Sequence, residues 1–256
     1  MPFFITYRHP SITTHTIALP SACICASSVH STGGYDDKPY FISKIAGNGA
    51  GNWKVNVPAL EATFGSIQGM AQSKNGDLYA SVPNKHVVLK LEFDKQEGTW
   101  SNVTIIAGTG SSGKGADDIV GTESALNNPM GLSLIEDSST GEVTAILIAD
   151  MKNHRIRQLD MSTRKITTMA GIGTSGFSGD DLQAKDAQLW FPQQMYYDKP
   201  TGDIYIVDTS NHRIRRVSGG KISTVVGKTC SIGAGLGDGG PATGACLNRP
   251  YYFTMN

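Results

Sequence analysis

The fold of this protein is decided by a stretch of eight residues that occurs twice, as DMKNHRIR at residues 150–157 and as DTSNHRIR at residues 208–215. The likeness continues downstream, where KITTMAG at residues 165–171 matches KISTVVG at residues 221–227. Shorter versions of this second motif end at Gly47 and Gly108. Self-similarity at a regular interval is the signature of a repeat architecture.

Each repeated unit contains short runs in which apolar and polar residues alternate, separated by turn residues such as Asn75-Gly76-Asp77. Such runs predict antiparallel strands joined by tight turns. The best preserved unit predicts four strands, which we call a, b, c and d, at residues 194–198, 203–207, 212–217 and 221–226. Four strands in each repeated unit predict the blades of a β-propeller.

The composition agrees with an all-β fold and excludes several functional classes. The chain has 256 residues, of which 30 are glycine, and its 22 Lys+Arg balance its 22 Asp+Glu. A neutral chain has no general electrostatic field that attracts nucleic acid or anionic lipid. No apolar run approaches the roughly 18–20 residues that span a bilayer, so no membrane span is predicted.

Glycine-rich connectors separate the units, and in each of them an aspartate stands 12 residues before a proline. The three pairs are Asp117 and Pro129, Asp180 and Pro192, and Asp238 and Pro250. Such regular spacing predicts one backbone path for all three connectors. Glycine supplies the positive φ angles on this path, and we expect each aspartate to accept hydrogen bonds from nearby amides.

These motifs resemble the NHL repeat family, whose signature appears here as NHRI at residues 153–156 and 211–214. The likeness is strong over residues 100–250 and weaker over residues 42–99. Before residue 42 it rests on spacing alone. The resemblance implies an all-β fold, an NHL-type β-propeller of four-stranded antiparallel blades. Propellers of this family commonly have five or six blades and act most often as binding platforms.

The landmarks predict how the chain is divided. We expect residues 1–9 to form an N-terminal extension and residues 10–256 to form the propeller. The predicted blades are residues 10–47, which are degenerate, 64–108, 127–171 and 190–227, and residues 250–256 begin a fifth. About four blades do not close a ring, and a bare sheet edge invites association. We favour a fragment of a longer propeller; pairing of the terminal pieces and self-association through the unclosed edges are the alternatives.

Histidines occupy equivalent positions in four units, at His30, His86, His154 and His212. Converging imidazoles could bind zinc, but the symmetry of a propeller spreads these residues around a ring. We therefore predict no metal or other cofactor, and expect the signature residues to complete the turn between strands b and c through hydrogen bonds to the backbone. These residues are Asp150, Asn153, His154, Asp208, Asn211 and His212.

The basic residues of strand c alternate with apolar ones and are Arg155, Arg157, Arg213, Arg215 and Arg216. We expect them on solvated faces of the outer strands. RNA binding requires a continuous basic surface with stacking aromatics, so RNA is a disfavoured partner. Calcium requires a run of spaced acids that no connector offers, so calcium is disfavoured as well.

Two cysteines, Cys230 and Cys246, flank the glycine-rich part of the last connector. A disulfide between them would close a loop and stabilise it. It would also favour an extracellular or cell-surface location over the cytoplasm. The alternative is a pair of free thiols.

No nucleophile, phosphate loop or carboxylate pair has catalytic spacing, so we expect a non-catalytic binding or scaffold module. Its inter-blade loops would contact a protein, peptide or glycan on the face that carries the d–a connectors and the b–c turns. We expect Arg155, Arg213, Phe177 and Asp180 to line this face. One alternative is a metal-dependent enzyme that resembles the peptide-amidating lyase of the same family. A second alternative is an inert fragment of a longer NHL protein.

Overall fold

The computed structural model describes residues 53–230 and 237–254, and before them the backbone of four short strands. These strands form two separate pairs, β1 (Phe3–Ile5) with β2 (Ile17–Leu19) and β3 (Ile24–Ala26) with β4 (Ser43–Ala46). His30 and most of the predicted blade at residues 10–47 lie outside the described residues.

Three antiparallel sheets follow in chain order, and we call them blades A, B and C. Blade A contains β6 (Gly69–Gln72), β7 (Leu78–Val82), β8 (Val87–Asp94) and β9 (Thr99–Ala107). Blade B contains β11 (Pro129–Glu136), β12 (Val143–Asp150), β13 (Arg155–Asp160) and β14 (Lys165–Ala170). Blade C contains β15 (Pro192–Asp198), β16 (Asp203–Asp208), β17 (Arg213–Ser218) and β18 (Lys221–Val226).

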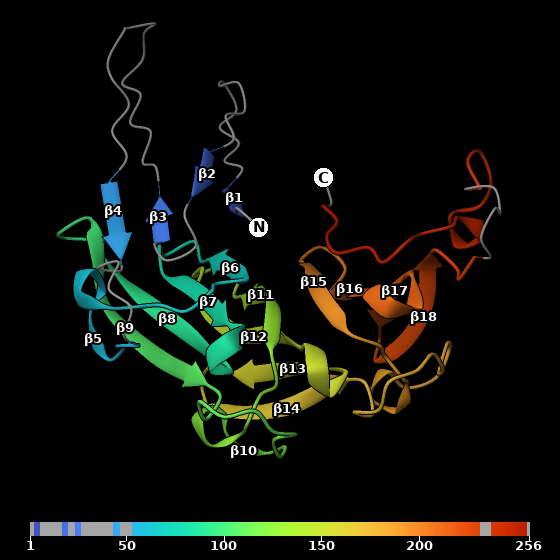
Figure 1. Cartoon of the computed structure of the whole chain (residues 1–256), viewed down its shortest axis with the longest axis horizontal. Helices are drawn as coiled ribbons and strands as arrows, with labels where there is room; N and C mark the ends of the chain where they lie inside the picture. Colours follow the sequence, from blue (N-terminus) through green and yellow to red (C-terminus); the bar gives the residue numbers. More distant parts are fainter. Residues whose placement is uncertain are drawn as a thin grey trace, which may run out of the picture.

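The expected fold class is confirmed: the chain is all-β and forms part of a propeller. The three blades follow one another around an arc, with β6, β11 and β15 toward the middle and β9, β14 and β18 at the outside (Figure 1). The described sheets do not close into a ring. The strands β7, β12 and β16 are nearly continuous buried runs, because the second strand of a blade is covered on both faces by its neighbours.

The connectors cover the outer edges of the blades. The connector into blade A contributes β5 (Val57–Pro58), which pairs with β9, and the connector into blade B contributes β10 (Ile119–Val120), which pairs with β14. In blade C a single bridge joins Gln183 to Lys221. Pairing of this kind leaves less of each outer strand exposed to other chains.

Single 3₁₀ turns recur at two places in the repeat. The b–c turns contain η2 (Pro83–Lys85), η4 (Met151–Asn153) and η6 (Thr209–Asn211). The connectors contain η1 (Ala59–Glu61), η3 (Gly121–Glu123), η5 (Ala184–Asp186) and η7 (Ala242–Gly244). No helix in the described ranges has the length and apolar character that a membrane crossing requires.

The apolar core lies between neighbouring blades, where one face of each sheet packs against the next. The cluster between blades A and B joins Tyr79 and Val88 to Leu132 and Ile146, and the cluster between blades B and C joins Leu147 and Ile156 to Met195 and Ile206. Each blade therefore depends on its neighbour for burial of its apolar side chains, as in other repeat proteins.

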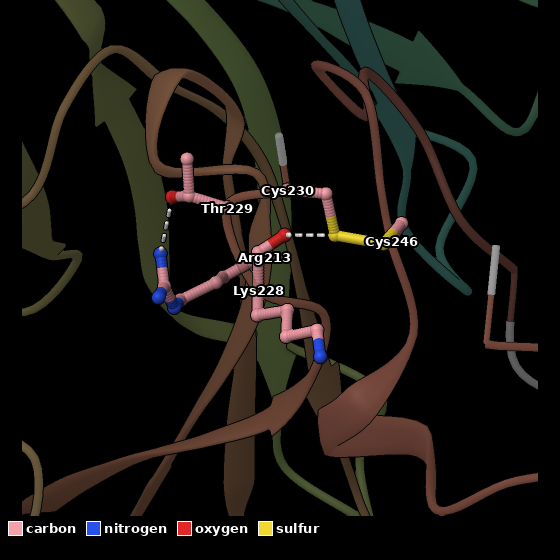
Figure 2. Close-up of a disulfide and its surroundings, with 5 residues drawn as sticks. All are labelled: Arg213, Lys228, Thr229, Cys230 and Cys246. Atoms are coloured by element: carbon pink, nitrogen blue, oxygen red, sulfur yellow. Dashed lines mark hydrogen bonds between the residues drawn. A yellow bond between two sulfur atoms is a disulfide. The ribbon is translucent and has the colours of Figure 1, made fainter. Parts of the chain in front are cut away.

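A disulfide joins Cys230 to Cys246 and staples the connector that leaves blade C (Figure 2). Beside it, Lys228 forms a parallel bridge with Cys246. Arg213 of β17 reaches the same connector and donates from Nη1 to Thr229 Oγ1 at 3.2 Å. The disulfide thus lies just beyond the outer strand β18, at the end of blade C that carries the b–c turn.

Candidate functional site

The b–c turns are held by an aspartate at the end of strand b. Asp150 accepts hydrogen bonds from the backbone of Asn127 at 2.7 Å and from Asn153 Nδ2 at 2.8 Å. Asp208 accepts equivalent bonds from Trp190 and Asn211 at 2.7 and 2.8 Å. The aspartate therefore joins its own turn to the start of its own blade.

The signature asparagine has a second partner in the preceding connector. Asn153 Nδ2 donates to the carbonyl of Gly113 at 2.7 Å, and Asn211 Nδ2 donates to the carbonyl of Gly176 at 2.7 Å. Because this hydrogen bond joins the connector to the b–c turn, the two loops are held in a fixed position relative to each other.

The signature histidine links each blade to the next one. His86, His154 and His212 all have left-handed backbone conformations, and each ring accepts at Nδ1 from a backbone N–H of the following repeat. The donors are Asn128, Phe191 and Arg249, at 3.1, 3.2 and 3.1 Å. A neutral ring that accepts at Nδ1 carries its proton on Nε2. Burial lowers the pKa of His154, which favours this neutral form.

The expectation that the strand-c arginines are solvated is wrong for Arg157 and Arg215, which are fully buried. Arg157 donates to Asp117 Oδ1 at 2.8 Å and lies 3.7 Å from Asp150 Oδ2. Arg215 donates to Asp180 Oδ1 at 2.7 Å and lies 3.6 Å from Asp208 Oδ2. A buried guanidinium is tolerated because carboxylates on both sides compensate its charge.

The connector aspartates likewise have partners that are distant in sequence. Asp117 accepts from the backbone and the hydroxyl of Thr168 at 3.1 and 3.0 Å, in addition to Arg157. For Asp117 and Asp180, contacts with the next blade therefore replace the expected local turn bonding: Asp117 contacts strands c and d, and Asp180 contacts strand c. The sequence shows the 12-residue register of Asp117 and Asp180, but the signal left unused was that each of these aspartates is followed by one strand-c arginine, Arg157 or Arg215, in the next blade.

The predicted surface residues come together only in part. Phe177 lies under the Arg213 guanidinium, with 3.8 Å between the ring centroid and Cζ, and Asp180 is bound to Arg215 beside them. Arg155 belongs to blade B, where it donates to the carbonyl of Lys114 and, at 3.5 Å, to Thr168 Oγ1. Arg155 and Arg213 begin strands β13 and β17, Phe177 and Asp180 lie in the connector between blades B and C, and all four are engaged in contacts within the protein.

A pocket with a volume of about 610 Å³ opens nearer the centre of the arc, and none of those four residues lines it. We call it the central pocket. Its walls come from inner strands, from the turn residues Pro83, Asn84 and His86, and from Met151 and Lys152. It therefore lies at the end of the propeller that carries the b–c turns, where the sequence predicts binding.

Four repeats contribute the same position to the central pocket. In blades B and C and in the last described segment, this position directly follows the landmark proline, and its residues are Met130, Gln193 and Tyr251. Gln68 is its counterpart in blade A. The inner strands β6, β11 and β15 are in contact around the arc, which brings Gln68, Met130 and Gln193 together, and the last described segment adds Tyr251 to the same pocket. A volume of this size falls within the usual range of ligand sites.

The framework around the central pocket is repeated, whereas the lining varies. The Asp-x-x-Asn-His frame of blade B recurs in blade C, but Lys152 corresponds to Ser210 there and to Asn84 in blade A. The position after the proline differs in the same way between Met130, Gln193 and Tyr251. Apart from His86, the side chains that hold the turns together are therefore not the side chains that line the pocket.

The lining contains one permanent charge, Lys152, and no aspartate or glutamate. Burial, and then the charge of Lys152, lowers the pKa of His86, so this ring is a neutral hydrogen-bonding group. Four amides, two hydroxyls, two thioethers and a proline ring complete the lining. Within the described ranges no three His, Cys, Asp or Glu side chains are grouped so that they could hold a metal ion.

Comparisons with known proteins agree with this architecture. The family model described as NHL repeat matches residues 189–217. Protein SUPPRESSOR OF QUENCHING 1, chloroplastic, from Arabidopsis thaliana is 34% identical over 103 residues, which are 40% of this chain and 9% of that protein. NHL repeat-containing protein 2 from Homo sapiens is 34% identical over 77 residues, which are 30% of this chain and 10% of that protein. The chain therefore matches only about a tenth of the length of these relatives.

Among solved structures, an auxiliary nutrient binding protein from Bacteroides thetaiotaomicron superimposes with a TM-score of 0.53 at 25% identity. The match covers 66% of this chain and 39% of that one. A counterpart from Bacteroides ovatus has the same TM-score at 22% identity and covers 62% of this chain and 37% of that one. The shared feature is the fold.

Proposed function

Since this chain is an NHL-repeat protein that forms part of a β-propeller, we propose that it is a non-catalytic binding module whose ligand site is the central pocket. The ligand would be a protein segment, a peptide or a glycan. The observation that carries this proposal is the convergence of one repeat position, at Gln68, Met130, Gln193 and Tyr251, on a single hollow.

The loops around the central pocket support a binding role. The b–c turns and connectors are fixed by the aspartate, asparagine and histidine contacts, so little conformational freedom is lost when a ligand binds. Binding residues on loops that a rigid scaffold positions are common in repeat folds. The nutrient-binding description of the Bacteroides neighbour points in the same direction.

The test is to fill the pocket without disturbing the fold. Gln193→Tyr is suitable because Tyr251 already occupies the equivalent position of the following repeat. Ligands selected for the wild-type chain from a displayed peptide library and from a glycan array would then be titrated against this variant by calorimetry. We expect affinity to fall at least tenfold, roughly the effect of losing one well-placed contact group.

The matched control is Arg213→Ala, which changes the outer loops and leaves the central pocket intact. Melting temperatures measured for both variants exclude unfolding as the cause of any loss. If Arg213→Ala weakens binding and Gln193→Tyr does not, the ligand binds the outer loops and the assignment to the pocket is wrong.

A further inference from the structure

Resting on the proposed function, we infer that Lys152 makes the central pocket selective for a short peptide that ends in a free carboxylate. The ligand would place its terminal carboxylate at Lys152 and an apolar side chain among the methionines of the lining.

The first step of the argument is the charge of the pocket. Lys152 is exposed, and within the described part of the chain its ammonium group makes no ion pair. Its backbone is nevertheless fixed, because Lys152 lies in η4 and its N–H donates to the carbonyl of Asn127, before β11, at 3.0 Å. A positioned cation with no acid beside it favours an anionic partner.

The second step is the hydrogen-bonding character of the lining. A carboxylate only accepts hydrogen bonds, so its partners must be donors. Donor groups are present on Asn84, Gln68 and Gln193, and His86 adds a ring N–H because its Nδ1 already accepts from Asn128. These groups line the same pocket as the single lysine, and no carboxylate lines it.

The third step separates a peptide from an acidic sugar. Met130, Met151 and Pro83 form an apolar part of the wall, and methionine adapts its shape to aliphatic side chains. Sugar rings bind mainly by stacking on large aromatic faces, and Tyr251 is the one Phe, Tyr or Trp residue of the lining. A volume of about 610 Å³ suits a few peptide residues.

The repeat itself supplies a variant that preserves the fold. Asn84 and Ser210 occupy the position of Lys152 in blades A and C, on turns of the same kind. Lys152→Ser therefore removes the charge while keeping a side chain that this turn accepts. Lys165→Ser, on the outer strand β14, is the matched control that removes an exposed lysine far from the pocket.

The experiment uses fluorescein-labelled Gly-Gly-Leu-Met with a free terminal carboxylate, and the same peptide as its terminal amide. Each is titrated with the intact chain and followed by anisotropy. We expect the carboxylate form to bind about tenfold more tightly than the amide, as a charge-assisted hydrogen bond provides. Lys152→Ser should remove this difference, whereas Lys152→Arg and Lys165→Ser should retain it.

Three results would overturn the inference. If both peptides bind equally and both are weakened by Gln193→Tyr, the proposed function stands and recognition of a carboxylate is wrong. If neither peptide binds at millimolar concentration, the peptide class is wrong. If tetragalacturonate binds, its binding depends on Lys152 and neither peptide binds, the ligand of the pocket is an acidic sugar. Peptide binding whose affinity is unchanged in the Gln193→Tyr variant would instead contradict the proposed function.

Discussion

At the scale of single residues, the main feature is a buried charge pair that is present in two blades and absent from the third. Asp150 and Arg157 in blade B have counterparts in Asp208 and Arg215 in blade C. In blade A the same two positions are Val82 and Leu89, both fully buried. Both charges are replaced together, which agrees with the cost of leaving either one buried without the other.

The pair predicts a strong coupling between two substitutions. Arg157→Leu should lower the free energy of unfolding by about 3–5 kcal/mol, because it leaves Asp150 buried without a cation. Adding Asp150→Val recreates the apolar pair of blade A and should recover part of this loss. Urea denaturation of both single variants and the double variant measures the coupling. Additive effects would show that the two residues do not act as a pair.

Burial of the same carboxylates predicts a pH dependence. Burial raises the pKa of Asp150 and of Asp208 to about 6, above the ordinary value of 3.8. Between these values the folded chain binds more protons than the unfolded chain. The contribution to stability is therefore complete below pH 4 and is lost as the pH rises through about 6. Asp208→Asn should flatten this part of the curve of unfolding free energy against pH.

The control for this prediction is Asp160→Asn. Hydrogen bonds from Thr163 and Ser162 lower the pKa of Asp160 to about 2, so its titration falls outside the window. An equal change of slope in this variant would show that the buried aspartates are not responsible.

At the scale of elements, the connectors share one hydrogen-bonded path and only the last contains a disulfide. Gly108, Gly171 and Gly227 donate from their backbone N–H groups to Gly121, Ala184 and Ala242, at 2.9, 3.0 and 3.0 Å. In the connector between blades B and C, Thr174 and Gln188 stand where the cysteines stand in the last connector. The hydrogen bonds shared by the connectors therefore form without a disulfide. The disulfide instead restricts the last connector, which no further described strand follows.

These equivalent residues define a disulfide-free variant. Cys230→Thr with Cys246→Gln should lower the free energy of unfolding by about 3 kcal/mol, the chain-entropy effect of opening a loop of this length. Thermal unfolding with and without dithiothreitol measures the effect. The reductant should destabilise the wild type and leave the variant unchanged; an equal response of both would contradict the prediction.

At the scale of the whole molecule, the arc depends on close approach of the inner strands. A Cβ atom on Gly131 of β11 would lie 2.7 Å from the carbonyl oxygen of Gln193 and 2.8 Å from Cα of Gln194. Gly69 of β6 has the same relation to the carbonyl of Met130, at 2.3 Å. Backbone therefore packs against backbone around the centre, and this contact brings the pocket positions of the three blades together.

This contact predicts that Gly131→Ala lowers the free energy of unfolding by about 1–3 kcal/mol, because rigid backbone must move to accept a methyl group. Gly244→Ala is the control, since a Cβ atom there meets nothing within 4 Å. Differential scanning calorimetry compares the two. A Gly131→Ala variant as stable as the control would show that the blades can shift apart without cost.

Self-association through the unclosed edges stays a prediction. Tyr196 of β15 is 37% exposed, Tyr251 and Tyr252 after blade C are 51% and 59% exposed, and exposed aromatic groups promote contact between molecules. We expect the sedimentation coefficient to rise with concentration, and Tyr196→Lys to reduce the rise. A constant coefficient over the same range would contradict it.

The sequence by itself determined the repeated strands, the turns between them and the positions of the landmark residues. These follow from alternation of apolar residues and from turn chemistry, which act over a few neighbouring positions. Only the tertiary structure decided that His154 bonds the next blade, that Arg157 is buried and that Met130 and Gln193 share a pocket. Those contacts join residues 37 to 63 positions apart, and which of them form depends on how sheets pack around a centre rather than on local pattern.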